Sequence, residues 1–224
     1  MLANLREVTG RIAAAAGRAG RDRDAVRVVA VTKTVGVEAI RMLVGAGQTD
    51  IGENRAQQIR DRSREFEGTA VRWHMIGRLQ RNKVKYVVPV CAMIHSVDSL
   101  PLAEEIAQRA TAAGAAATCL LEVNVAGEDR KAGVAPDDAV RLAERAAALE
   151  GIDLAGLMTM APLVDDPETV RPVFAALREL MERINREADL PRPLTDLSMG
   201  MTQDYEVAVE EGATIVRIGS ALFR

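Results

Sequence analysis

The chain has 224 residues, of which 48% are hydrophobic, 27% are charged and 3% are aromatic, and its formal net charge is -3. A slightly acidic chain with few aromatic side chains is not typical of nucleic-acid-binding proteins, which are usually basic. No apolar run approaches the roughly 20 residues that span a bilayer and the N-terminus lacks a signal-peptide pattern, so we expect a cytoplasmic protein that binds neither nucleic acid nor membranes.

The predicted elements begin with an amphipathic helix, because Leu2, Leu5, Val8 and Ile12 recur on one helical face among charged residues. Eight short apolar runs follow, separated by segments of helical periodicity, of which the stripe over residues 170–184 is the clearest. The predicted strands cover residues 27–33, 50–54, 72–77, 93–97, 118–125, 152–160, 194–200 and 214–220.

Strands that alternate with helices predict βαβ units and a parallel sheet. An N-terminal helix followed by eight such units favours an α/β fold, a single-domain (β/α)₈ TIM barrel over residues 1–224. A doubly wound open sheet is the alternative. It usually has fewer strands and a glycine-rich first turn, which is absent after the first predicted strand.

Polar residues stand where nearly every apolar run stops. They are Lys33, Glu53, Asn54, His74, His95, Ser96, Glu122, Asn124, Thr159, Ser198, Thr202, Arg217 and Ser220. Because a barrel carries its chemistry at the carboxyl ends of its strands, these residues together predict a pocket there.

The seventh and eighth predicted strands each end with a hydroxyl residue near a glycine, Ser198 with Gly200 and Ser220 with Gly219. Barrels often hold a phosphate at the loops after these two strands. Glycine lets backbone N–H groups approach a phosphate, and hydroxyls donate further hydrogen bonds. A phosphorylated small molecule is therefore indicated, with ordinary serine–glycine turns as the alternative.

Lys33 ends the first predicted strand, and a lysine desolvated at a barrel mouth can form a Schiff base with an aldehyde. Pyridoxal 5'-phosphate (PLP) and sugar phosphates are candidate aldehydes, so a PLP-free aldolase stays open. Arg217 shares the strand face of Gly219 and is predicted to point into the barrel. A buried arginine needs a partner, and a pyridine nitrogen is one suitable acceptor.

At this point seven stretches resemble the pyridoxal-phosphate homeostasis family (YggS/PROSC-like), which is similar to the N-terminal barrel of alanine racemase. They are "VVAVTKT", "DIGENRAQ", "WHMIGRLQRNK", "IHSVDS", "LEVNVAGEDRKAG", "GLMTM" and "LSMGMTQDYEVAVEEGATIVRIGSALF", in order between Val28 and Phe223.

The resemblance implies that Lys33 carries PLP covalently as an aldimine and that Arg217 faces the pyridine nitrogen. It also implies a set of further cofactor-binding residues: Asn54 in the cofactor region, and Ser198, Met199, Gly200, Gly219 and Ser220 around the phosphate. The family commonly has serine before the lysine and Lys-Pro after "KT". Here Thr32 keeps the hydroxyl, whereas Val35-Gly36 predicts a looser loop after Lys33.

The family resemblance favours a PLP-binding protein of PLP homeostasis without efficient catalysis, with PLP-dependent apo-enzymes as candidate partners. Racemisation needs acid–base groups on both faces of the cofactor, and in the racemases a tyrosine of an added domain and the partner subunit supplies the second. This chain ends at Arg224, so we expect a non-catalytic monomer. The alternative is a small PLP-dependent racemase or related enzyme, with His74 or Tyr205 as second base.

Two further groups of residues carry weaker signals. His74 and His95 are the only histidines and lack the spacing of metal ligands, so we expect no metal site and a supporting role for His74 in the pocket or core. The basic cluster Arg78, Arg81, Lys83 and Lys85 is typical of a solvated surface, with an anionic partner as the alternative.

Overall fold

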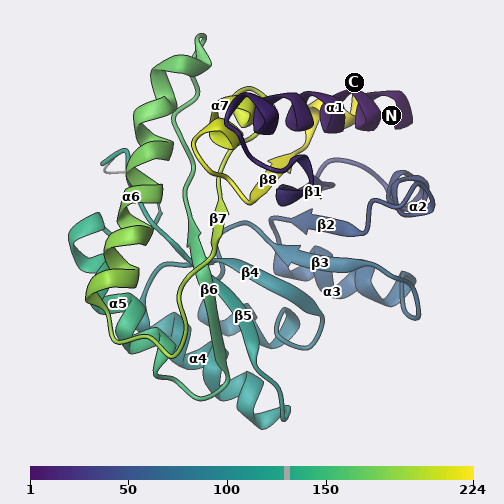
Figure 1. Ribbon diagram of the computed structural model, residues 1–224. Helices are drawn as coiled ribbons and strands as arrows, with labels where there is room; N and C mark the ends of the chain where they lie inside the picture. Colours follow the sequence, from purple (N-terminus) through teal and green to yellow (C-terminus); the bar gives the residue numbers. More distant parts are fainter. Residues whose placement is uncertain (129–131) are drawn as a thin grey trace.

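The computed structural model describes residues 1–128 and 132–224; residues 129–131, in the predicted loop after the fifth strand, lie outside the described residues. Eight parallel strands of the described chain close into a barrel in sequential order (Figure 1). They are β1 Arg27–Val31, β2 Asp50–Glu53, β3 Arg72–Met75, β4 Cys91–Val97, β5 Ala117–Glu122, β6 Ile152–Met158, β7 Asp196–Ser198 and β8 Ile215–Ile218. The predicted (β/α)₈ barrel is confirmed, and the open doubly wound sheet is wrong.

Helices connect successive strands and cover the outside of the barrel (Figure 1). The α-helices are α1 Leu2–Arg18, α2 Val37–Gly45, α3 Ala56–Glu65, α4 Leu100–Ala112, α5 Pro136–Ala147, α6 Arg171–Glu187, α7 Tyr205–Glu210 and α8 Ser220–Phe223. Short 3₁₀ turns are η1 Arg23–Ala25, η2 Arg81–Tyr86 and η3 Pro167–Val170. The predicted N-terminal helix and the apolar stripe of α6 are confirmed, since both bury their apolar faces. Every helix in the described residues is too short or too polar to cross a bilayer.

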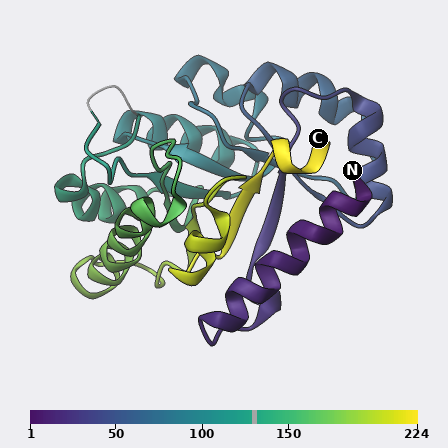
Figure 2. The same ribbon diagram turned by 90° about the horizontal axis from the view of Figure 1, so that it is seen from above.

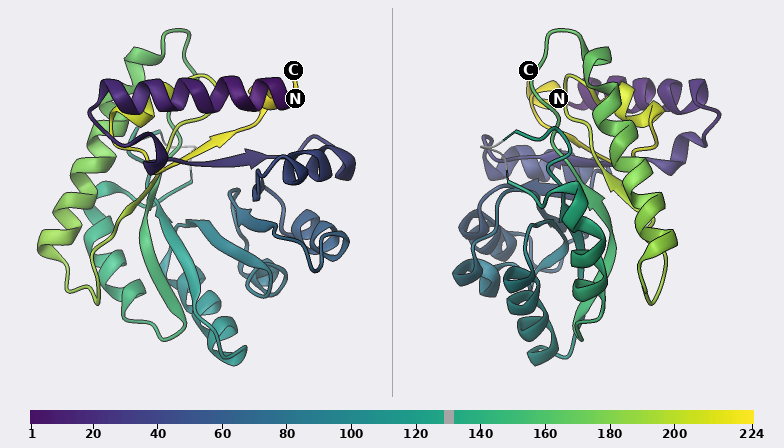
Figure 3. Two further views of the ribbon diagram at one scale, coloured as in Figure 1. Left: turned by 45° about the vertical axis from the view of Figure 1, so that its right-hand side comes forward. Right: turned by 90° about the vertical axis from the view of Figure 1, so that its left-hand side faces the viewer.

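The N-terminal helix α1 packs against α7 and α8, so the two chain ends lie side by side (Figures 2 and 3). The amide of Asn4 donates to the carbonyl oxygens of Leu222, at 3.3 Å, and Arg224, at 2.7 Å. The extra helix therefore covers the sector in which the last strand meets the first.

Strand residues divide between two cores because their side chains alternate between faces. On β1, Val28 and Ala30 belong to the large core between barrel and helices, whereas Val29 belongs to a separate small cluster. That inner cluster consists of Val29, Met93, Leu120, Ala155, Met158 and Ile215. Only a thin apolar layer fills the barrel interior, and the rest of the interior is left to polar side chains.

Seven of the eight strands end earlier than predicted at the end that faces the site, and β1 and β7 are the two that matter for the candidate segments. β1 ends at Val31, and Lys33 lies in a turn that the Val35 N–H closes on the Thr32 carbonyl at 3.1 Å. β7 ends at Ser198, since Gly200 adopts φ +91°, which a strand residue does not. Both candidate segments are therefore loops beyond the strand ends.

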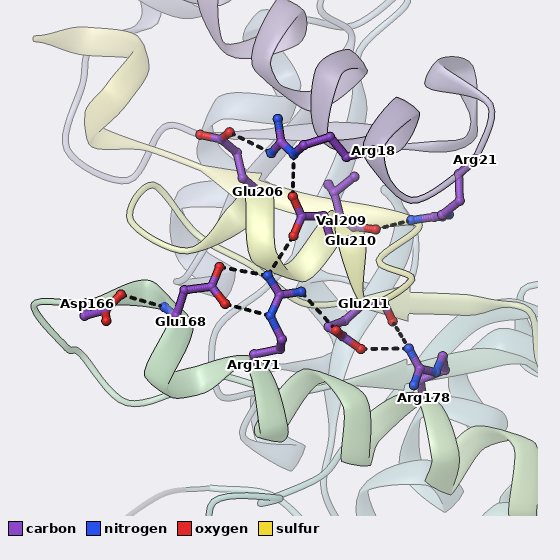
Figure 4. A network of polar contacts seen from close by, with 10 residues as sticks. All are labelled: Arg18, Arg21, Asp166, Glu168, Arg171, Arg178, Glu206, Val209, Glu210 and Glu211. Carbon is purple, nitrogen blue, oxygen red and sulfur yellow. Dashed lines mark hydrogen bonds and ion pairs between the residues drawn. The ribbon is translucent and has the colours of Figure 1, made fainter.

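A network of ion pairs fixes α7, the short helix that follows the loop after β7 (Figure 4). Arg18 of α1 contacts Glu206 and Glu210 from one side. From the other side Arg171 and Arg178 of α6 contact Glu210 and Glu211. These pairs tie three helices together around the β7–β8 connection.

Candidate functional site

Lys33 lies at the barrel mouth but its side chain is exposed, so the expected desolvated amine is wrong for the protein alone. The physical reason is the early end of β1, which leaves Lys33 on a turn above the sheet. Val31 neighbours Gly219, the residue directly after β8, and a Cβ built on Gly219 would lie 3.5 Å from Val31 Cβ. Closure of the barrel between β8 and β1 thereby brings Lys33 near the loop that carries Gly219 and Ser220.

Arg217 points into the barrel, as predicted, and is only 4% exposed. Its Nη1 donates to Ser198 Oγ at 2.6 Å and its Nη2 donates to the Thr159 carbonyl at 2.8 Å. Burial lowers the pKa of Arg217 to about 10, against the opposing charges of nearby Asp204 and Glu122. Since a guanidinium has five N–H donors, Arg217 keeps donors for a ligand.

Ser198 belongs to a buried polar chain that crosses the barrel interior. Its hydroxyl lies 2.8 Å from His95 Nδ1, His95 Nε2 lies 2.9 Å from His74 Nδ1, and His74 Nε2 lies 2.8 Å from Asp50 Oδ1. One proton arrangement satisfies every group: Arg217 donates to Ser198, which donates to His95, which donates to His74, which donates to Asp50. The Ser198 hydroxyl is thus committed to Arg217 and His95.

Burial keeps both histidines of this hydrogen-bonded series neutral. It lowers the pKa of His74, although the hydrogen bond to Asp50 opposes the shift, and it lowers the pKa of His95 much further. For Asp50 burial alone would raise the pKa, but the hydrogen bond from His74 and the charge of Arg72 lower it on balance. This series of hydrogen bonds therefore links the anionic Asp50 to the cationic Arg217 through two neutral imidazoles and the Ser198 hydroxyl.

The four other residues predicted around a phosphate differ in what they offer. The Met199 side chain packs in the outer core and its N–H bonds Ile215, so a contact through that side chain is excluded in this structure. Gly200 and Gly219 lie in the two loops and Ser220 begins α8, and in the described part of the chain their N–H groups make no hydrogen bond within the protein. These donors are open to an anion.

Asn54 follows β2 at the barrel mouth, directly after the strand that pairs with β1 ahead of Lys33. It lines a shallow pocket with a cavity volume of about 180 Å³, together with Arg55, Arg78 and Lys83, and none of the other seven predicted site residues lines that pocket. The basic cluster is otherwise exposed, as predicted for Arg78, Arg81 and Lys85.

Glu122, one of the polar residues expected at the strand ends but given no role in cofactor binding, is 3% exposed at the end of β5. Burial, with the charge of Asp98 as a second cause, raises the pKa of Glu122 to about 7. Thr202, from the same strand-end set, accepts a hydrogen bond from the Ala221 N–H through its hydroxyl at 3.3 Å and so links the segments that follow β7 and β8.

The two residues proposed as a second base do not occupy suitable positions. His74 is fully buried and engaged on both ring nitrogens, which confirms a supporting role. Tyr205 packs between α7 and α1, with the Arg11 guanidinium 5.6 Å from its ring centroid. Among the described residues, no group of three or more histidine, cysteine, aspartate or glutamate side chains is placed to hold a metal ion.

The arrangement at the mouth fits an aldehyde that carries a phosphate and a ring nitrogen. It combines an exposed primary amine on Lys33, unused loop N–H groups at Gly200, Gly219 and Ser220, and a buried guanidinium with spare donors. Amines condense with aldehydes, N–H groups bind phosphate, and a guanidinium donates to a ring nitrogen.

The chain is similar to proteins of a known family. Residues 3–224 match the family described as "Alanine racemase, N-terminal domain". The pyridoxal phosphate homeostasis protein of Aquifex aeolicus is 44% identical over 219 residues, which covers 98% of this chain and 95% of the relative.

Two solved structures are also similar to this chain. A crystal structure of an unknown protein from Bifidobacterium adolescentis has a TM-score of 0.92 and 39% sequence identity. The match covers 99% of this chain and 94% of the Bifidobacterium chain. PipY of Synechococcus elongatus, solved with PLP bound, has a TM-score of 0.84 and 34% sequence identity. The match covers 97% of this chain and 100% of the PipY chain.

Proposed function

The chain belongs to the alanine racemase N-terminal domain family and, within it, to the pyridoxal phosphate homeostasis proteins, and from this premise we propose that it holds PLP reversibly on Lys33 without efficient catalysis. PLP supplies an aldehyde that condenses with a primary amine, and it would be released again by hydrolysis. The PLP-bound structure of the related PipY supports binding of this cofactor.

Each part of the mouth has a role in this proposal. The amine of Lys33 bonds to the aldehyde carbon of PLP, and the aldehyde oxygen leaves as water. The N–H groups of Gly200, Gly219 and Ser220 hold the phosphate, and Arg217 donates to the pyridine nitrogen. Asn54 is a cofactor contact in the same proposal, whereas Ser198 acts through Arg217 and Met199 through its backbone.

Arg217 is the single observation that carries the proposal. It is a buried cation that forms no ion pair within the described residues, and its two protein acceptors are neutral. Burying a cation without an anionic or hydrogen-bonding partner lowers the stability of the fold, so a guanidinium with spare donors here indicates a ligand that accepts its remaining hydrogen bonds. A guanidinium opposite the pyridine nitrogen would also leave that nitrogen unprotonated, which weakens the cofactor as an electron sink and supports holding over turnover.

The test is a titration of the protein with PLP, followed by borohydride reduction and peptide mass spectrometry. We expect the pyridoxyl mass on the peptide that contains Lys33, and no such mass in Lys33→Ala. Lys85→Ala, which removes another exposed lysine, is the matched control and should behave as the wild type. Equal PLP attachment in Lys33→Ala and wild type would overturn the proposal.

A racemase or related PLP enzyme is the rival reading, and it needs a second acid–base group. Since His74 is bonded on both ring nitrogens and Tyr205 packs between α1 and α7, Glu122 is the mouth residue whose pKa of about 7 suits that task. Incubation of the PLP-loaded protein with L- and D-alanine distinguishes the two. Steady interconversion that disappears in Glu122→Gln would favour the enzyme.

The proposal extends to the cellular setting: a cytoplasmic monomer that supplies PLP-dependent apo-enzymes. Light scattering on the PLP-loaded protein tests the monomer, and a dimer mass at micromolar concentration would contradict it. Transfer is tested by mixing the loaded protein with an apo-transaminase and following recovery of transaminase activity. Recovery no faster than PLP release into buffer would argue against direct supply.

A further inference from the structure

The turn that carries Lys33 is held by a residue from another element. The Val35 N–H bonds the Thr32 carbonyl at 3.1 Å, so Lys33 and Thr34 form the corner of the turn. Within the described residues, the Lys33 side chain itself makes no hydrogen bond or ion pair. The position of its amine is therefore set by the backbone of this turn.

Arg62 of α3 grips both ends of that turn with one guanidinium. Its Nη1 donates to the Thr32 carbonyl at 3.0 Å and its Nη2 donates to the Val35 carbonyl at 2.6 Å. These two carbonyls flank Lys33 on either side. A planar guanidinium fixes both at once, which a lysine ammonium does not do with the same geometry.

Glu53, at the end of β2, completes the clamp. It is fully buried, forms an ion pair with Arg62 and accepts a hydrogen bond from the Thr32 hydroxyl. Its second oxygen, Oε2, has no hydrogen-bond partner among the described residues, and burial raises the pKa of Glu53 against the effects of Thr32 and Arg62. A buried carboxylate in this state is retained at a cost in stability, which points to a task beyond packing.

We propose that Arg62 and Glu53 are positioning residues that hold the Lys33 turn so that the amine meets the aldehyde of PLP. The inference rests on the proposed function, and it deepens it by assigning the residues that place the reacting amine. Holding two reacting groups together raises their effective concentration, so a loosened turn lowers the equilibrium yield of the carbon–nitrogen bond.

Two ligands separate positioning from general damage to the site. PLP forms the bond with Lys33, whereas 4-deoxypyridoxine 5'-phosphate has the ring and phosphate but no aldehyde. In Arg62→Lys we expect PLP affinity to fall about tenfold, the size of one lost hydrogen bond to a charged group, while affinity for the deoxy analogue stays within about twofold, because its ring and phosphate contacts are untouched. Borohydride trapping on Lys33 should slow in parallel.

Arg21→Lys is the matched control. Arg21 also holds two backbone carbonyls with one guanidinium, those of Val209 at 2.6 Å and Ala213 at 2.9 Å, but far from Lys33 in the fold. It should lower the melting temperature of the PLP-free protein as Arg62→Lys does and leave the PLP affinity unchanged.

The outcomes are separable. Equal loss of both ligands in Arg62→Lys, or unchanged PLP affinity, would overturn the clamp while the proposed function stands. Equal attachment of PLP to Lys33→Ala and to the wild type would overturn the proposed function itself. If Arg62→Lys does not fold, Glu53→Gln gives the same comparison: it keeps the size of the side chain, removes the ion pair, and must show the same selective loss.

Discussion

The polar chain through the barrel makes a quantitative prediction for His95→Phe. Phenylalanine keeps a ring at this fully buried position but removes both nitrogens. The Nδ1 acceptor of His74 and the hydroxyl hydrogen of Ser198 would then be buried without partners. At about 1–3 kcal/mol for each unsatisfied group, we expect a loss of about 2–6 kcal/mol, out of about 5–15 kcal/mol for a typical protein.

The assay is urea unfolding of the PLP-free protein at pH 7.5, followed by circular dichroism. Ser96→Ala is the control, because Ser96 neighbours His95 in sequence and its buried hydroxyl has no hydrogen-bond partner in the described part of the chain. That substitution should be neutral or slightly stabilising. A loss below about 0.5 kcal/mol for His95→Phe, the range typical of surface substitutions, would refute the reasoning.

The pH dependence gives the same prediction a second readout. Burial lowers the folded-state pKa of both His74 and His95 below the unfolded value of about 6.5. As pH falls below about 6.5, the two histidines therefore bind protons in the unfolded state but stay neutral in the folded state, and the free energy of unfolding decreases. His95→Phe removes one such group, so its deficit relative to wild type should shrink between pH 7.5 and pH 5; a constant deficit would contradict a neutral buried His95.

Three further predictions test other parts of the structure. Burial raises the pKa of Glu122 to about 7, so ionisation of this carboxyl favours the unfolded state as pH rises above about 4.5. Glu122→Gln should therefore raise the free energy of unfolding above that of wild type by up to about 3 kcal/mol at pH 8, but not at pH 4.5. Gly200→Ala places a Cβ 2.6 Å from Ala208 Cβ at φ +91° and should cost about 2–4 kcal/mol in urea unfolding, whereas Gly212→Ala, at φ +107° without a clash, should cost about 1 kcal/mol. Arg171→Met breaks the half-exposed network of Figure 4 and should cost about 1 kcal/mol at low salt, and nothing measurable in 1 M NaCl.

The amino-acid sequence by itself determined the fold and the family. Apolar runs of strand length, separated by stripes of helical period, depend only on neighbouring residues, so eight strands and their helices could be read in order. Strand alternation also placed Arg217 inside the barrel, because its side is fixed by parity with Gly219. The same parity argument, applied from Ser198, would have placed the Met199 side chain in the outer core.

Only the tertiary structure decided which of these residues meet. The chain from Asp50 through His74, His95 and Ser198 to Arg217 draws on β2, β3, β4, β7 and β8, and the clamp on Lys33 joins β2 to α3. Parity says which face a side chain takes, but its partner depends on the register of neighbouring strands around the closed barrel. Where each strand stops is likewise set by hydrogen bonds to its neighbours, and for that reason Lys33 lies on an exposed turn rather than at the buried end of a strand.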